Sequence, residues 1–231
     1  MLKSRESQTL PFRVSIVSME ILFTVVILIV SVMLHEMAHG FAALYLGDPT
    51  AKYQNRLTLN PLHHIDPVGS ILVPIIGFFW GGGLIIGWAK PVPYNPYNFR
   101  PNRYFDVAKY GDAFVSIAGP LTNIILAIIF GLFIRFSSPL GEVATIFANP
   151  AFINLSVIVT SLNIGLAIFN LIPVPPLDGS KILFSLFPTK WYELRARLEN
   201  MGLFLIVIVF IVAGTFISPI ISLCFRLITG F

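Results

Sequence analysis

The hydrophobic positions of the chain gather into long apolar segments that are separated by polar loops. Five such segments cover Val14–Leu46, Val68–Trp88, Phe114–Phe136, Phe152–Ile172 and Met201–Leu227. Each approaches or exceeds the roughly 20 residues that an α-helix needs to cross about 30 Å of hydrocarbon. The pattern therefore predicts an all-α polytopic membrane protein, with residues 1–231 forming a single integral-membrane domain.

The second apolar segment differs from the others because it is rich in glycine. It contains Pro74 and the run Gly81-Gly82-Gly83, which do not favour a continuous helix. Irregular backbone at membrane depth is tolerated only where it lies beside protein or water. We therefore expect Val68–Trp88 to be re-entrant rather than a full crossing.

The polar loops carry weaker local signals. Alternation over Tyr53–Leu59 predicts a short β-strand after the first apolar segment. Four prolines exclude a regular helix over Lys90–Pro101. The charged run Trp191–Asn200 predicts a polar helix at the membrane interface.

Composition agrees with the bilayer as the surrounding solvent. The chain is 56% hydrophobic and 11% charged, whereas soluble domains contain about 25% charged residues. Its net charge of +4 is spread over several loops, whereas a nucleic-acid-binding protein concentrates basic residues on one face. We therefore expect no nucleic-acid partner. The short chain with its single cysteine is typical of a multi-pass protein of a prokaryotic plasma membrane.

Three ionisable residues interrupt the first apolar segment near its C-terminal end. The run His35-Glu36-Met37-Ala38-His39 matches the pattern His-Glu-x-x-His. On a helix the two histidines lie one turn apart on one face, so they can bind one ion, and Glu36 can reach a water on it. Ionisable residues in a membrane cost at least about 2.5 kcal/mol and usually mark a functional path. The alternative is a hydrogen-bonded pair of core histidines.

Catalytic zinc usually has three protein ligands, so a third residue must join the histidines. The candidates are His63, His64, Asp48, Asp66, Asp106, Asp112 and Asp178. Asp178 stands apart because three prolines stiffen the chain before it and Gly179 permits a turn after it. Its alternative role is the N-cap of a short helix.

The two segments together resemble the site-2 protease family of intramembrane zinc metalloproteases (M50-type). The family segment Asn-x-x-Pro-x-x-Pro-Leu-Asp-Gly is matched by Asn170–Gly179, and the likeness extends over most of Val32–Lys181. Further matching motifs are Leu59-Asn60-Pro61-Leu62, His64-Ile65-Asp66-Pro67-x-Gly69, Gly87–Pro93 and Ala118-Gly119-Pro120-x-x-Asn123. No PDZ or CBS module accompanies them, so the chain resembles a compact form of the family.

The resemblance implies a role for each matching residue. His35, His39 and Asp178 would bind one Zn²⁺ ion, and Glu36 would be the general base. Asn170 would orient the substrate or stabilise the developing oxyanion. The implied activity is that of a zinc metalloendopeptidase, which hydrolyses peptide bonds of transmembrane or membrane-associated substrates with a zinc-activated water.

Other parts of the chain bear on the substrate path. His64 matches a recurrent histidine of the family, for which we expect a structural hydrogen bond. The glycine-rich Gly77–Gly87 and the strand predicted over Tyr53–Leu59 could line the path of an unwound substrate. Flexible packing is the alternative role of these glycines.

The metal site also constrains the membrane topology. If His39 and Asp178 lie on one membrane side, the first and fourth apolar segments run parallel, and the two segments between them supply only one full crossing. Counts of Lys and Arg slightly favour five full crossings instead. We favour the parallel arrangement, which places the site nearer the cytoplasm.

Two other functions would use metal ligands inside a membrane. A metal carrier or channel could bind its cargo at His35, His39 and Asp178, but it would have no use for Glu36 between the histidines. An inactive scaffold predicts missing ligands, whereas every expected ligand is present.

Overall fold

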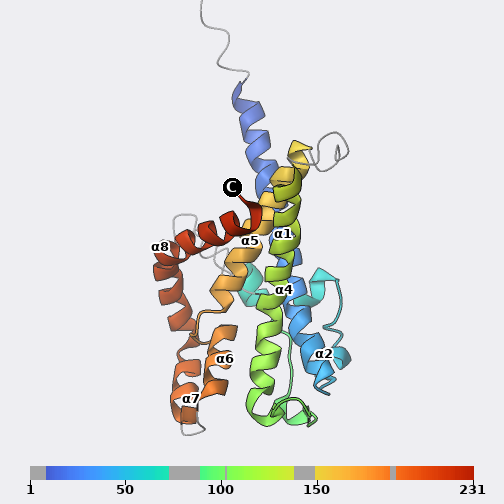
Figure 1. The fold of residues 1–231 in the computed structure, drawn as a ribbon, viewed down its shortest axis with the longest axis vertical. Helices are drawn as coiled ribbons and strands as arrows, with labels where there is room; N and C mark the ends of the chain where they lie inside the picture. The colour runs from blue at the N-terminus through green and yellow to red at the C-terminus, as the bar shows by residue number, and fades with distance from the viewer. Residues whose placement is uncertain (1–8, 73–88, 102, 138–148, 188–190) are drawn as a thin grey trace, which may run out of the picture.

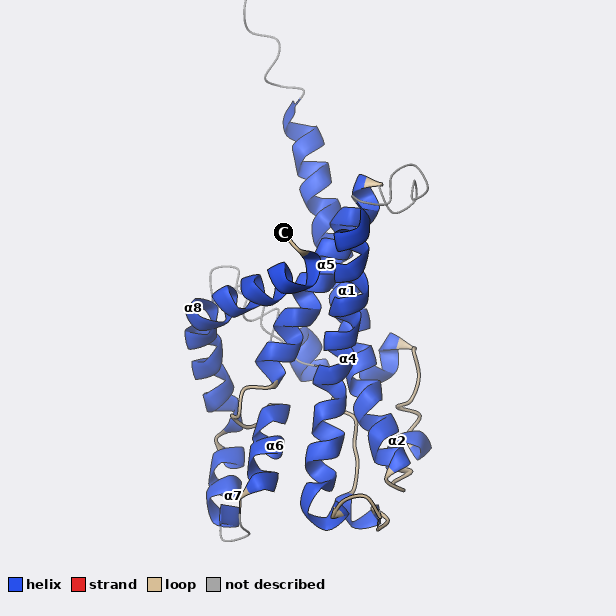
Figure 2. Cartoon of the chain, viewed as in Figure 1, coloured by secondary structure: helices blue, strands red, loops and turns tan. Residues whose placement is uncertain are grey.

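The computed structural model describes residues 9–72, 89–101, 103–137, 149–187 and 191–231, and their regular structure is helical throughout (Figure 2). The long helices are α1 (Thr9–Tyr45), α4 (Val107–Ser137), α5 (Pro150–Asn170) and α8 (Gly202–Thr229). The shorter α-helices are α2 (Thr50–Tyr53), α6 (Asp178–Leu186) and α7 (Tyr192–Asn200). Single turns of other helix types are η1 (Pro61–His64), η2 (Pro67–Leu72) and η3 (Pro96–Asn98). The predicted all-α class is thus confirmed for the described residues.

Three helices are long and apolar enough to cross a membrane. They are Ile21–Tyr45 of α1, the whole of α4 and the whole of α5. Large apolar side chains remain exposed on them, such as Ile21 at 59% and Ile125 at 49%, as expected where lipid covers the surface. The five predicted segments are therefore matched by three spanning helices among the described residues.

The other two predicted segments differ from this pattern. Most of the segment expected to be re-entrant, residues 73–88, lies outside the described residues, and its described start forms η2. The fifth segment forms α8, which contains Pro219 and changes direction along its length (Figure 1). Proline removes a helical hydrogen bond and kinks the helix.

The spanning helices form a bundle in which α1 and α5 run in one direction and α4 runs against them (Figure 1). The contacts of α1 agree with this, because His35 meets Asn123 while His39, one turn later, meets the earlier residue Val115. The C-terminal ends of α1 and α5 consequently lie at the same end of the bundle. The helix directions match the parallel arrangement that we favoured for the first and fourth segments.

The strand predicted over Tyr53–Leu59 is wrong. This stretch holds the end of α2, a turn and bends. Asn55 adopts the left-handed region with φ 52°, which ends the helical turn. Arg56 then points inward and donates to the main-chain oxygens of His63 and Lys90. A strand also needs a partner for its ladder, and no strand occurs among the described residues.

Two loop predictions are confirmed and one element was missed. The polar helix predicted over Trp191–Asn200 is α7, and Lys90–Pro101 contains only the single turn η3. Helix α6 was missed as an element of the fold, since a short helix appeared here only in the alternative that made Asp178 its N-cap. It is nevertheless the element that carries Asp178.

Candidate metal centre

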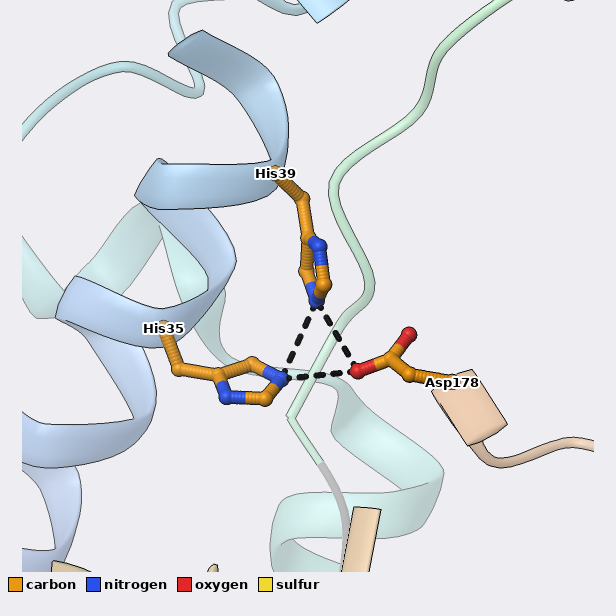
Figure 3. Close-up of side chains that lie close together, drawn as sticks. All are labelled: His35, His39 and Asp178. Atoms are coloured by element: carbon orange, nitrogen blue, oxygen red, sulfur yellow. Dashed lines mark hydrogen bonds and ion pairs between the residues drawn. The ribbon is translucent and has the colours of Figure 1, made fainter. Parts of the chain in front are cut away.

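The three predicted ligands converge in the structure. His35 and His39 project from one face of α1 toward Asp178, the first residue of α6 (Figure 3). The two Nε2 atoms lie 3.0 Å apart, and Asp178 Oδ2 lies 3.2 Å from His35 Nε2 and 3.1 Å from His39 Nε2. All three residues are at most 8% exposed. Side chains from distant parts of the sequence thus direct three atoms that can bind a metal, here called the donor atoms, to one point.

Gly179 allows the chain to bring Asp178 to this point. A Cβ at Gly179 would lie 2.2 Å from the main-chain oxygen of Leu171 and 2.6 Å from that of Ile172. The start of α6 therefore packs directly on the turn that follows α5. Leu177 occupies the N-cap position and caps no backbone group with its side chain. The alternative role of Asp178 as an N-cap is thus wrong, and its carboxylate faces the histidines.

Gly119 allows α4 to approach the two imidazoles. A Cβ at this position would lie 2.5 Å from Nε2 of His35 and 2.5 Å from Nε2 of His39. These separations are far shorter than a van der Waals contact. The sequence analysis placed Gly119 in a family motif but assigned it no role. The structure shows that a side chain here would enter the space between the donor atoms.

The far side of each imidazole is fixed by a hydrogen bond. His39 Nδ1 donates to the main-chain oxygen of Val115 over 2.7 Å, and His35 Nδ1 donates to Asn123 Oδ1 over 2.5 Å. A carbonyl oxygen only accepts, so in each neutral ring the proton is on Nδ1 and Nε2 carries a lone pair. Hydrogen bonds of this kind typically orient histidines that bind metals. Both lone pairs are directed toward Asp178.

The donor set fits a zinc ion. Two imidazole nitrogens and one carboxylate oxygen are ligands that zinc uses in catalytic sites, where a fourth position stays open. In a tetrahedral site with bonds of about 2.0–2.1 Å, ligand atoms stand about 3.3–3.4 Å apart. The observed separations of 3.0–3.2 Å need only a small expansion to reach that spacing.

Glu36 lies on α1 between the two histidines and is half-buried. Its Oε2 accepts a hydrogen bond of 2.8 Å from the main-chain N–H of Val92. Burial holds the pKa of Arg56 below its ordinary value, and the negative charge of Glu36 offsets this only in part. The loop that contains Val92 therefore holds one oxygen of the predicted general base.

Among the described contacts, neither Asn170 nor His64 has a hydrogen bond to His35, His39 or Asp178. The side chain of Asn170 donates to the main-chain oxygen of Leu166 on its own helix over 2.9 Å. His64 is buried and its Nε2 donates to the main-chain oxygen of Thr58 over 2.9 Å. The structural hydrogen bond that we expected for His64 is thus present, and the role of Asn170 stays a prediction.

Sequence reasoning assigned no role to Lys181, a basic residue on the same helix as Asp178. Lys181 lies one turn after Asp178, and its Nζ sits 5.2 Å from the ring centre of Tyr94. Burial lowers the pKa of Lys181, but Tyr94, Asp178 and Asp112 raise it, and the net direction is upward. The ammonium group therefore stays charged beside Tyr94, under the influence of Asp112 on α4 and Asp178 on α6.

Sequence reasoning also missed the polar residues that lie behind His35. Asn123 on α4 and Asn163 on α5 are fully buried, and Asn163 contacts Ser31 on α1. Asn123 appeared only as part of a family motif. Polar residues inside apolar segments were the available signal, because a membrane helix carries few of them without a partner.

Comparisons with known proteins show what the chain is similar to. The family model described as "Peptidase family M50" matches residues 135–214. The chain is 38% identical over 190 residues to "Putative zinc metalloprotease YwhC" of Bacillus subtilis (strain 168), which covers 82% of this chain and 80% of the relative. It is 30% identical over 185 residues to "Putative zinc metalloprotease Rip2" of Mycolicibacterium smegmatis (strain ATCC 700084 / mc(2)155), which covers 80% of this chain and 64% of the relative.

No solved structure shows a significant match to the chain. The likeness to the Bacillus subtilis protein nevertheless extends over four fifths of both proteins. Together with the family match, this extent of similarity shows that the chain belongs to peptidase family M50, the site-2 protease family that its motifs resemble.

Proposed function

We propose that this protein is an intramembrane zinc metalloprotease that hydrolyses peptide bonds of transmembrane or membrane-associated substrates. The observation that carries the proposal is the meeting of His35, His39 and Asp178, whose donor atoms lie 3.0–3.2 Å apart. This cluster lies on and beside helices that can cross a membrane. Family membership and the printed names of the relatives support the same activity.

The chemistry divides between the metal and the side chains of the protein. His35, His39 and Asp178 would hold one zinc ion, which when bound polarises a carbonyl and lowers the pKa of water toward 7. Glu36 is the general base: it takes a proton from the attacking water and delivers it to the leaving amine. The N–H of Val92 binds Glu36 Oε2, so this contact holds the base in place.

The position of the site also restricts the substrate. A membrane-spanning helix satisfies its own backbone hydrogen bonds, so it must unwind locally before a peptide carbonyl can reach the site. Asn170 is our candidate for orienting the unwound segment or stabilising the oxyanion, because it matches the family motif at the end of α5. We propose a multi-pass location in a prokaryotic plasma membrane, with lipid around α1, α4 and α5.

The proposal is tested by substituting the base without touching the ligands. Purified wild type and Glu36→Gln are reconstituted in liposomes, and zinc content is measured together with cleavage of a panel of tagged single-pass helices. We expect Glu36→Gln to retain zinc and to lose cleavage. Glu193→Gln is the matched control, because its carboxylate is exposed on α7. Zinc transport into the liposomes that persists in Glu36→Gln, with no cleavage by wild type, would favour a carrier instead.

A further inference from the structure

A line of buried polar side chains leads from the metal centre across all three spanning helices. Asn123 Oδ1 on α4 accepts from His35 Nδ1 on α1, and Asn123 Nδ2 donates to Asn163 Oδ1 on α5 over 2.8 Å. Asn163 Nδ2 donates to Ser31 Oγ and to the main-chain oxygen of Val159, each over 2.9 Å. Both asparagines are fully buried, and Ser31 is 3% exposed. We call His35, Asn123, Asn163, Ser31 and the Val159 carbonyl the polar relay.

The two asparagine amides of the polar relay can be oriented in only one way, because one end of the relay is a backbone carbonyl. The oxygen of Val159 can only accept, so the amide nitrogen of Asn163 must face it. The amide oxygen of Asn163 then faces Asn123, which must turn its own nitrogen toward Asn163. The oxygen of Asn123 therefore faces His35, whose Nδ1 must carry the proton. In the neutral ring, His35 Nε2 is left with the lone pair that a metal requires.

The two histidines differ in which group keeps the proton on Nδ1 and so leaves the lone pair on Nε2. His39 Nδ1 donates directly to the main-chain oxygen of Val115, and a main-chain oxygen can only accept a hydrogen bond. His35 meets an amide side chain, which could turn over and offer an N–H instead. A turned-over Asn123 would favour the His35 tautomer with the proton on Nε2, and that tautomer cannot bind a metal. Only the contact with Asn163 opposes this in the relay.

We propose that Asn163 is a positioning residue of the metal centre, which acts through Asn123 to hold His35 in its metal-binding tautomer. Asn163 itself touches none of the donor atoms in the contacts that the structure describes. The inference rests on the proposed zinc site. It predicts that a residue on α5, two side chains away from the donor atoms, sets the zinc affinity of a histidine on α1.

The first test compares two substitutions of similar size. Asn163→Leu removes the acceptor that orients Asn123, and we expect zinc affinity to fall measurably, by no more than the roughly 10–100-fold that losing a direct outer partner of a metal ligand costs. Asn163→Asp keeps an oxygen facing Asn123, and burial favours its protonated form, which can also donate to Val159. We therefore expect Asn163→Asp to bind zinc nearly as wild type. Affinity is measured by chelator competition on purified protein in detergent.

The second test asks whether Asn163 acts through the orientation of Asn123. An aspartate at 123 has two acceptor oxygens, so it presents an acceptor to His35 whichever way it turns. The double variant Asn123→Asp/Asn163→Leu should therefore bind zinc more tightly than Asn163→Leu alone. A carboxylate beside His35 raises its basicity as a ligand in any background, so a purely structural role of Asn163 predicts only the gain in zinc affinity that Asn123→Asp alone gives to the wild-type chain. Thr160→Val is the matched control, because Thr160 is equally buried on α5 and its hydroxyl has no hydrogen-bond partner among the described residues.

The outcomes separate this inference from the proposed function. Wild type that binds no zinc would overturn the proposed metalloprotease itself. If wild type binds zinc and a folded Asn163→Leu binds it with the same affinity, only the role of Asn163 is overturned. The same conclusion follows if the zinc affinity of the double variant stays as low as that of Asn163→Leu. If Asn163→Leu does not fold, as judged by circular dichroism, Asn163→Asp still tests the idea. A folded Asn163→Asp that loses zinc affinity 10-fold or more would contradict it.

Discussion

Substitution of Gly119 by alanine tests how closely the metal centre depends on α4. The added Cβ would lie 2.5 Å from Nε2 of both His35 and His39. Because ordinary carbon contacts are about 3.5–4.0 Å long, α4 or the imidazoles must move apart by about 1 Å. Zinc sites tolerate ligand displacements of only about 0.2 Å. The substitution therefore cannot be absorbed without disturbing the site.

The expected result is a protein that folds but no longer holds zinc in a productive geometry. Overpacking costs about 1–3 kcal/mol of stability, whereas a misplacement of about 1 Å at a reacting centre can cost about 100-fold in rate. We expect Gly119→Ala to lower zinc affinity and peptide cleavage at least about 100-fold. The assay combines chelator competition, cleavage of a tagged substrate helix and thermal unfolding in detergent.

The control is a second glycine on the same helix. A Cβ at Gly131 would lie 2.4 Å from the Ile228 side chain of α8, away from the metal centre. Gly131→Ala should therefore reduce thermal stability while zinc affinity stays as in wild type. Wild-type zinc affinity in Gly119→Ala would refute the reasoning, because it would mean that α4 does not limit the space between the histidines.

Three further predictions concern the segments that hold the site in place. Gly179→Ala should destabilise the protein by at least about 1–3 kcal/mol and lower its zinc content, because the new Cβ would meet the main-chain oxygen of Leu171; an unchanged melting temperature would contradict this. Val92→Pro removes the N–H that binds Glu36, so kcat should fall by about tenfold or more while zinc content is unchanged; an unchanged kcat would show that this contact does not position the base. Burial raises the pKa of Asp48, but hydrogen bonds from Asn98, from Thr50 and from the N–H of Asn95 hold it below its ordinary value. Its stabilising effect is therefore complete above the unfolded pKa of about 4 and is lost as the pH falls through the lower folded value. Asp48→Asn should accordingly lower the melting temperature at pH 7, and the difference from wild type should shrink in acid; a difference that is constant with pH would exclude this role.

The residues of the candidate metal site were predictable because each follows from a local pattern. The spacing of His35 and His39 equals one helical turn, so any helix over that segment places both rings on one face. Asp178 was singled out by the prolines before it and by Gly179 after it, together with the family motif. The long apolar segments similarly predicted α1, α4 and α5, because burial in a membrane leaves a strong compositional signal.

The parts that sequence reasoning missed depend on which helix faces pack together. No local pattern shows that Asn123 and Asn163 share a hydrogen bond, because the two residues lie on different helices. The role of Gly119 likewise appears only when α4 is placed against α1. The strand predicted over Tyr53–Leu59 failed for a related reason: weak alternation in a short loop supplies no partner strand, and Arg56 is held by loop carbonyl groups instead.

The central claim is that His35, His39 and Asp178 hold a single zinc ion. It is tested most directly by equilibrium zinc titration of purified wild type and of Asp178→Asn, with folding checked by circular dichroism. The account predicts one zinc ion per chain in wild type and a large loss of affinity in the folded Asp178→Asn. Zinc binding of wild-type strength in Asp178→Asn would contradict it.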